Sequence, residues 1–265
     1  RRHLCEGRWE RHLPRDCLSI TIMDTLVARL QDTLSSDQAT RDAAEQYLAH
    51  ETLPKSGTDD VLGVQLAQIL SEASLSLFVR QAAAIALKKY VRKRWSIFFD
   101  TFTQDMVVNG IVQTVDATPV EAKEHIRTSL LACLCDAEPK VRSQASDILS
   151  LISSCDFPDH FPQLLPTLQG YLHSYTEQDA HAAYKVHGAM KFLLDLVHVE
   201  LDENQLLMVA QQLVPLLQGI VSSSSDWITP HTRARCINVF HQCLISLYMA
   251  KDTYVDTVHM VTTHY

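Results

Sequence analysis

The sequence is poor in the residues that punctuate β-sheet proteins, with only 7 Gly and 9 Pro among 265 residues. Tight turns between short strands depend on those residues, and no segment keeps up an alternation of apolar and polar positions. A run of about 20 consecutive apolar residues is also missing, and we therefore expect no membrane-spanning helix and no membrane insertion. These absences favour a fold made of amphipathic helices.

Sequence signatures of catalysis and of metal binding are missing as well. The chain has no Walker-type phosphate loop, no zinc-protease histidine pair and no nucleophile elbow. Its seven cysteines form no C-x-x-C pair, and the one close pair, Cys133 and Cys135, has no matching Cys or His pair nearby. We therefore expect a protein that is not an enzyme and needs no cofactor or metal. Scattered thiols of odd number are typical of a reducing cytosolic or nuclear compartment.

The excess of positive charge that usually marks a nucleic-acid-binding domain is absent too. The chain has 23 Lys and Arg residues against 31 Asp and Glu residues, a formal net charge of −8. Because release of counterions from phosphates drives nucleic-acid affinity, this charge argues against direct nucleic-acid binding. An acidic surface is compatible with basic protein partners, although moderate acidity is also an ordinary way for a protein to stay in solution.

What the sequence does contain is an internal repeat. Five segments share a basic residue, a small residue three positions later and a large apolar residue seven positions later. They begin at Arg41, Arg80, Arg142, Lys185 and Arg233. The small residues are Ala44, Ala83, Ala145, Gly188 and Cys236, and the apolar ones are Leu48, Leu87, Leu149, Phe192 and Phe240. Offsets of three and seven share one helical face, so a second helix can approach at the small residue while the large one fills the space beside it.

Each repeated segment follows a candidate partner helix, and these helices begin near Asp24, Asp59, Pro119, His160 and Glu203. The intervals 41–80, 142–185 and 185–233 span 39, 43 and 48 positions, near the roughly 40–47-residue period of HEAT repeats. The interval 80–142 is longer and contains MVVNGIVQTV from Met106, which we interpret as an inserted helical turn or a longer first helix. We therefore predict an all-α fold, an α-solenoid of about five HEAT repeats in which antiparallel helix pairs stack into a superhelix.

Residues 44–95 carry a more specific resemblance. The sequence AEQYL from Ala44, a second helix, and VRQAAAIALKKYVRKRW ending at Trp95 together resemble the N-terminal module of the importin-β (karyopherin) superfamily. The segments EAKEHIRTSLLACLCDAEPKVRSQASDILSLIS and SSCDFPDHFPQLLPTL resemble the repeats that follow this module. The segment from Val186 to Met190, VHGAM, is similar to one found in the importin-9 branch of the superfamily. The resemblance covers about residues 23–250.

The resemblance implies a division of the chain, which we expect to be part of a longer protein. Residues 1–22, ahead of Met23, are interpreted as a non-native or disordered extension, and residues 23–95 as the importin-β N-terminal module with the first two HEAT repeats. Residues 96–250 hold further HEAT repeats, and residues 251–265 are interpreted as the truncated start of the next repeat.

The resemblance also implies a function, that of a nuclear transport receptor shuttling between cytoplasm and nucleus. Such receptors bind the GTP form of the small GTPase Ran on the concave side lined by second helices. They carry cargo, which in the importin-9 branch is basic and includes core histones, and Phe-Gly nucleoporins dock between first helices. The candidate Ran contacts are Gln81, Lys88, Lys89 and Arg92. Two alternatives are an export receptor, which binds cargo together with Ran-GTP, and a HEAT scaffold with no GTPase partner.

The basic end of the helix expected over residues 77–95 has two simpler explanations. Lys and Arg in the last turns of a helix interact favourably with its dipole, each by about 0.3–1 kcal/mol. A patch that binds nucleic acid is the other explanation, which the net charge disfavours.

Overall fold

The computed structural model describes residues 15–52, 61–96, 99, 105–108, 111–114, 118–177, 180–198 and 201–249. These ranges contain ten α-helices, one short 3₁₀ helix and two strands. In chain order the elements are α1 (Arg15–Asp32), α2 (Gln38–Glu51), α3 (Leu62–Ser71), α4 (Leu77–Arg94), β1 (Asp105–Val108), β2 (Ile111–Thr114), α5 (Val120–Cys133), α6 (Pro139–Asp156), α7 (Leu164–His173), η1 (Ser174–Thr176), α8 (Ala180–His198), α9 (Glu203–Ser222) and α10 (Pro230–Met249).

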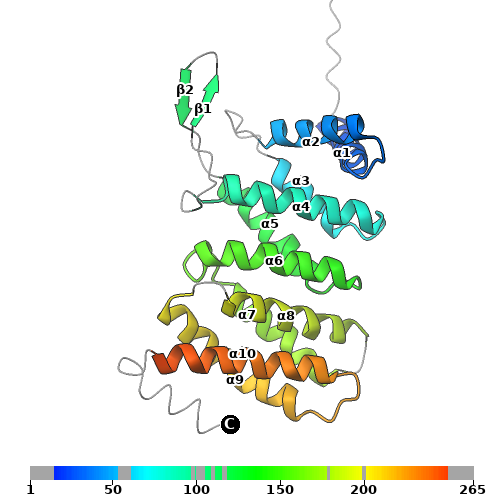
Figure 1. Cartoon of the computed structure of the whole chain (residues 1–265). Coiled ribbons are helices and arrows are strands. Elements are labelled where there is room, and N and C mark those ends of the chain that lie inside the picture. The colour runs from blue at the N-terminus through cyan, green and yellow to red at the C-terminus, as the bar shows by residue number, and fades with distance from the viewer. Residues whose placement is uncertain are drawn as a thin grey trace, which may run out of the picture.

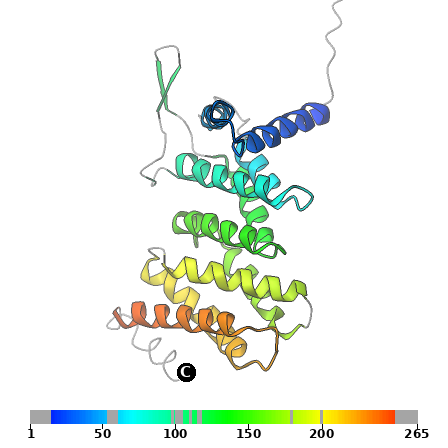
Figure 2. The ribbon, with the colours of Figure 1, turned by 45° about the vertical axis from the view of Figure 1, so that its right-hand side comes forward.

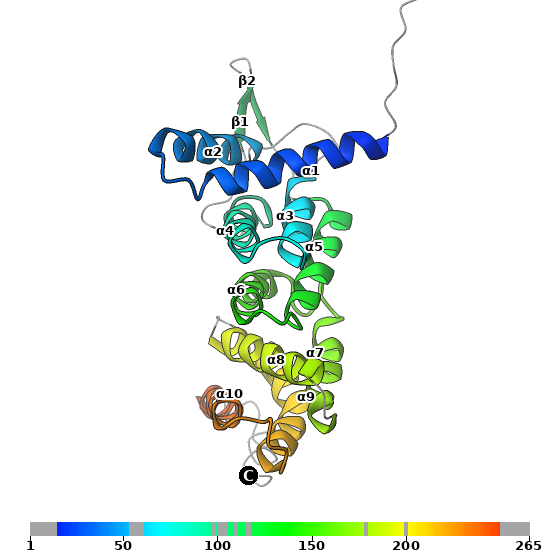
Figure 3. The ribbon, with the colours of Figure 1, turned by 90° about the vertical axis from the view of Figure 1, so that its right-hand side faces the viewer.

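The helices form a stack of pairs in two layers (Figure 1). The second helices of the pairs, α4, α6, α8 and α10, pack one on the next, and the first helices α3, α5, α7 and α9 lie behind them (Figure 3). Each pair buries its apolar face against its neighbours, so the core is continuous along the stack. The prediction of an α-solenoid of HEAT repeats is confirmed.

Local sequence explains where several helices begin. The side chain of Asp37 accepts a hydrogen bond from the backbone N–H of Thr40 and caps α2, and Ser76 caps α4 in the same way. Asp202 and Gln205 form a reciprocal capping box at the start of α9. Caps of this kind each stabilise a helix by roughly 0.5–2 kcal/mol because they satisfy N–H groups that have no partner within the helix.

The residues of the repeat signature lie at the contacts between helices. The small residues Ala44, Ala83, Ala145, Gly188 and Cys236 are all buried. A Cβ atom placed on Gly188 would lie 1.8 Å from the carbonyl oxygen of Leu134, so α8 approaches the end of α5 too closely for any larger residue. Of the apolar residues, Leu87, Leu149 and Phe192 are fully buried, whereas Leu48 and Phe240, in the two end pairs, are partly buried.

The basic residue of the signature has a role that the spacing did not suggest. In four pairs it is an arginine that donates to a backbone carbonyl between or at the end of the helices of its own pair. The bonds run from Arg41 to Ser35 (2.6 Å), from Arg80 to Leu70 (2.8 Å), from Arg142 to Asp136 (2.6 Å) and from Arg233 to Ile228 (2.8 Å). Leu70 lies in the last turn of α3, and the other three carbonyl groups lie in the connections between the helices of a pair, so each bond fixes the path from the first helix to the second.

The interpretation of MVVNGIVQTV as helical was wrong, because the structure forms an antiparallel hairpin there. Strand β1 pairs with β2, with Val108 opposite Ile111 and Asp105 opposite Thr114. β-Branched residues on both sides of the dipeptide Asn109-Gly110 are the strongest short-range signal for a two-residue hairpin loop. Part of the extra length between the second and third pairs is therefore a ribbon, which lies at the end of the stack that also carries α1 and α2 (Figure 1).

The expected boundary at Met23 does not coincide with the start of a structural element. Helix α1 begins at Arg15 and runs through Met23 to Asp32, so part of the segment interpreted as a disordered extension is helical. Residues 1–14 and the expected start of a further repeat at 251–265 lie outside the described residues.

The first pair of helices is placed differently from the others. Helix α1 packs against α2 and across α4, and the two helices lie over the end of the stack (Figures 2 and 3). Helix α2 therefore does not continue the regular stack of α4, α6, α8 and α10. Its only fully buried residue is Ala44.

One described helix has the length and apolar composition of a membrane-spanning helix, which the sequence did not lead us to expect. The stretch Asn204–Ser222 of α9 is long and apolar enough to cross a membrane, with a mean hydropathy of 1.3. Helix α9 packs against α7 and α10 as the first helix of its pair. Core helices of this kind pass the same test, which considers only length and composition.

Candidate binding surface on the second helices

Helix α4 presents the four residues predicted to contact a GTPase. It begins at the cap of Ser76 and buries a stripe that includes Ala83, Leu87 and Tyr90. The predicted contacts lie outside this stripe: Gln81 and Lys88 are partly exposed, and Lys89 and Arg92 are exposed. The structure therefore leaves all four accessible, and their helical spacing places Gln81, Lys88 and Arg92 along one side of α4 with Lys89 next to them.

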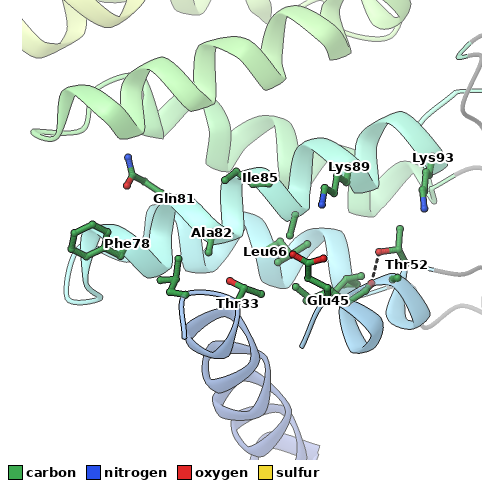
Figure 4. Close-up of a pocket in the computed structure, with 15 residues that line it drawn as sticks. Thr33, Glu45, Thr52, Leu66, Phe78, Gln81, Ala82, Ile85, Lys89 and Lys93 are labelled. Atoms are coloured by element: carbon green, nitrogen blue, oxygen red, sulfur yellow. Dashed lines mark hydrogen bonds between the residues drawn. The ribbon is translucent and has the colours of Figure 1, made fainter. Parts of the chain in front are cut away.

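Gln81 and Lys89 lie on the face of α4 that is turned toward the first pair of helices. They line a groove of about 340 Å³ between α4 and the α1–α2 pair, which we call the α4 groove. Figure 4 shows Phe78 near the start of α4 and Lys93 near its end, with Thr33 of the α1–α2 connection and Glu45 of α2 on the opposite side. The apolar lining comes mainly from Leu34, Leu48, Leu66, Phe78, Ala82 and Ile85.

Lys88 lies on the side of α4 that borders α6 and takes part in a series of charges that crosses the second helices. Its ammonium lies 3.8 Å from the carboxylate of Asp147 on α6, and Asp147 lies 3.5 Å from the ammonium of Lys191 on α8. Lys191 also pairs with Asp195, which accepts a hydrogen bond from Ser146. Because these side chains are partly exposed, each pair adds little stability, and their main effect is to align charges of both signs along α4, α6 and α8.

A second polar group gathers near the starts of α6, α8 and α10. A hydrogen bond of 2.7 Å joins Nδ1 of His187 on α8 to the hydroxyl oxygen of Thr232 on α10. The ring of His187 also packs edge to face against the ring of Trp227. Burial lowers the pKa of His187, and the neighbouring charges of Arg142, Arg235 and His231 lower it further. The imidazole is therefore held in its neutral form between three helices.

Buried hydrogen bonds and ion pairs join distant residues within one helix pair and between successive pairs, and no pattern in the sequence indicated them. Asp156 at the end of α6 accepts hydrogen bonds from Trp95 (3.0 Å) and from Arg127 (2.8 Å), and all three residues are buried. Arg80 of α4 pairs with Asp136 in the connection from α5 to α6. These contacts join residues about 30 to 60 positions apart, which no local pattern can reveal.

The buried thiols are packing groups. Burial raises the pKa of Cys133, Cys236 and Cys243 to about 12, so all three are protonated at neutral pH. Among the residues that the structure describes, no three His, Cys, Asp or Glu side chains gather as ligands for a metal ion.

Part of the chain, including this surface, is similar to known proteins. Residues 49–136 match the family model of the importin-beta N-terminal domain. The chain is 28% identical over 193 residues to importin subunit beta-5 of Schizosaccharomyces pombe, covering 72% of this chain and 18% of that protein. It is 23% identical over 227 residues to importin-9 of Drosophila melanogaster, covering 86% and 20%. It is also 27% identical over 143 residues to exportin-2 of Drosophila melanogaster, covering 54% and 13%.

Solved structures share the fold. Yeast importin-beta (Kap95p) superimposes with a TM-score of 0.64 at 16% identity, covering 91% of this chain and 27% of that one. The exportin Cse1 in its cargo-free state gives a TM-score of 0.58 at 16% identity, covering 85% and 23%. The chain spans about a fifth or less of the length of the curated relatives named above.

Proposed function

We propose that the chain forms the Ran-binding portion of an importin, a nuclear transport receptor of the importin-β superfamily, because residues 49–136 match the importin-beta N-terminal domain and the chain is similar to two importins. The receptor shuttles between cytoplasm and nucleus, binds Ran in its GTP form and carries basic cargo such as core histones inward. Phe-Gly nucleoporins dock between first helices on the opposite side. The observation that carries the proposal is the match of residues 49–136, which contain the accessible face of α4.

Two further properties support this assignment. A structure with the same fold, at a TM-score of 0.57 and 14% identity, is that of Kap95p with RanGDP. The net charge of −8 suits a carrier of basic cargo, because opposite charges accelerate and strengthen association. Gln81, Lys88, Lys89 and Arg92 are the proposed Ran contacts.

An export receptor is the second candidate, and the similarity to exportin-2 supports it. The two candidates differ in thermodynamic linkage. In an importin, Ran-GTP and cargo lower each other's affinity, whereas in an exportin each raises the affinity of the other by the same factor.

Calorimetry of the 265-residue chain with Ran loaded with GTP or GDP tests the shared part of the proposal. We expect tight binding of the GTP form and at least tenfold weaker binding of the GDP form. Replacing Lys89 and Arg92 by Ala is expected to weaken binding of the GTP form, whereas Lys140→Ala, an exposed control on α6, leaves it unchanged. Equal affinity for the two forms would contradict the proposal.

A dimer of core histones then separates import from export. Its affinity for the chain is measured with and without saturating Ran-GTP. A fall in affinity supports an importin, and a rise supports an exportin. If the histone dimer does not bind while Ran-GTP does, the assignment of histone cargo to this portion of the receptor is wrong.

A further inference from the structure

The α4 groove lies where the regular stack of second helices is interrupted. Helices α6, α8 and α10 are each covered on one side by the preceding second helix. The corresponding side of α4 meets α1 instead, and α2 lies across the end of the stack (Figure 3). As a result, large apolar side chains along the groove remain open to solvent, with exposures of 53% for Leu34, 66% for Phe78 and 55% for Ile85.

The shape of the groove matches a helix. Phe78, Ala82, Ile85 and Lys89 follow one another at intervals of three or four residues and lie along one side of α4. From Phe78 to Lys93 this side extends over about 22 Å, which corresponds to about four helical turns. In the rest of the stack the equivalent space is filled by a second helix of the protein itself, so a helix is the element that this architecture accommodates.

The charged side chains that line the groove determine which kind of helix can bind there. Lys89 and Lys93 lie one turn apart near its end, and neither forms an ion pair with any residue that the structure describes. By contrast, Lys88 on the neighbouring side of α4 pairs with Asp147 of the helix stacked there. A helix that occupies the groove can present carboxylates to Lys89 and Lys93 in the same way. Because these two ammonium groups outnumber Glu45, the third charged group of the lining, an acidic helix is favoured over a basic one.

We propose that the α4 groove binds an amphipathic, acidic α-helix of a partner protein. Its apolar stripe packs against Phe78 and Ile85, and its carboxylates pair with Lys89 and Lys93. Residues at positions i, i+3, i+4 and i+7 of the partner make the apolar contacts, as in other complexes of a helix in a groove. This interaction goes beyond the binding of Ran and cargo and can be tested without either, although it shares Gln81 and Lys89 with the proposed Ran surface, so that Ran and the helix would compete.

A designed peptide tests the proposal. The probe is a fluorescein-labelled helical peptide of about four turns with leucines on one face and glutamates beside them, titrated with the 265-residue chain by fluorescence anisotropy. The comparison peptides replace every glutamate by lysine, or keep the composition while spreading the leucines around the helix. We expect the acidic amphipathic peptide to bind at least tenfold more tightly than either.

Matched variants locate the binding site. Ile85→Glu places a charge in the groove and is expected to weaken binding at least tenfold, whereas Ile237→Glu replaces an isoleucine of similar exposure (53%) on α10 and has no effect. The double variant Lys89→Glu, Lys93→Glu is expected to prefer the lysine peptide. Circular dichroism verifies that each variant is folded.

Three outcomes would overturn the proposal. They are absence of saturable binding by the folded chain, equal binding of the scrambled peptide, and equal losses in Ile85→Glu and Ile237→Glu. The last two would show that the peptide adheres without using the groove. Because the readout contains no Ran, these results leave the proposed transport function untouched, and failure of Ran binding would leave the groove untouched.

Discussion

At the scale of single residues, Gly188 is the described glycine at which an added Cβ atom would come closest to a neighbour. A Cβ atom there would overlap the carbonyl oxygen of Leu134, and a backbone oxygen cannot turn away as a side chain can. We expect Gly188→Ala to lower the free energy of unfolding by about 1–3 kcal/mol, the cost of overpacking a close helix contact. Urea denaturation followed by circular dichroism measures this difference.

Gly170 provides the matched control. It also lies within a helix, α7, but a Cβ atom there would have no neighbour within 4 Å. Since Ala is the better helix former, Gly170→Ala should stabilise the protein by about 0.5–1 kcal/mol. If both variants changed stability equally, the tight approach at Gly188 would not be the cause.

His187 makes stability depend on pH. Its pKa in the folded protein is lowered below 6.5 by burial and by the charges of Arg142, Arg235 and His231, so the unfolded chain takes up the proton first. The contribution of the neutral imidazole is therefore complete above about pH 6.5 and is lost as the pH falls through the lowered pKa. We expect the free energy of unfolding to decrease below about pH 6.5, measured by urea denaturation from neutral to mildly acidic pH.

The variant His187→Gln tests this assignment, because it keeps a hydrogen-bonding group beside Thr232 but cannot take up a proton. Its stability should fall less than that of the parent over the same pH range. His181→Gln, at an exposed position of α8, should leave the profile unchanged. Parallel profiles for the parent and His187→Gln would show that other groups cause the pH dependence.

The residues that could be identified from the sequence follow a local pattern, whereas those that were missed make contacts between segments far apart in the chain. The small and large positions of the repeat, such as Ala145 and Leu149, follow from helical periodicity, which is a local property. The bonds of Asp156 to Trp95 and Arg127 depend on how distant segments meet, and one sequence contains no record of that. The candidate contacts on α4 are accessible, as a polar stretch of helix leads one to expect, but which neighbours they have, the α1–α2 pair or α6, depends on how distant segments pack.

At the scale of elements, the hairpin β1–β2 is the clearest departure from a regular solenoid. Helical periodicity dominated the interpretation of the segment from Met106, although Asn109-Gly110 between β-branched residues is a local signal for a hairpin. The first helices and second helices themselves were predicted correctly, because each keeps its apolar period over ten residues or more.

The hairpin should be dispensable for folding. Its strands pair with each other and pack against no described helix to any large extent, and an isolated two-stranded ribbon is at best marginally stable. Replacing residues 105–114 by a Gly-Ser linker of the same length should change the free energy of unfolding by less than about 1 kcal/mol. Leu149→Ala, which opens a cavity in the core of α6, should cost about 2–5 kcal/mol in the same urea titration. Equal losses would mean that the hairpin is part of the core.

At the scale of the whole molecule, stability should vary along the stack, because each helix pair contacts only its neighbours. Helix α2 buries only Ala44 fully, whereas α6 lies between α4 and α8 and buries nine residues. We therefore expect amide hydrogens of α2 to exchange at least about tenfold faster than those of α6 in hydrogen-exchange mass spectrometry. Uniform exchange along the chain would indicate that the protein opens as a single unit.

The arginines of the repeat determine how such a molecule can bend. Arg41, Arg80, Arg142 and Arg233 each tie the two helices of one pair through a backbone carbonyl, so a pair behaves as a stiff link. We therefore expect bending to occur at the joints between links. Partly exposed charges such as Lys88 and Asp147 can exchange partners there at little energetic cost, whereas the pair of Arg80 and Asp136 stiffens the joint between the second and third pairs. A small rotation at every joint, added along the chain, changes the pitch of the superhelix while every link keeps its shape.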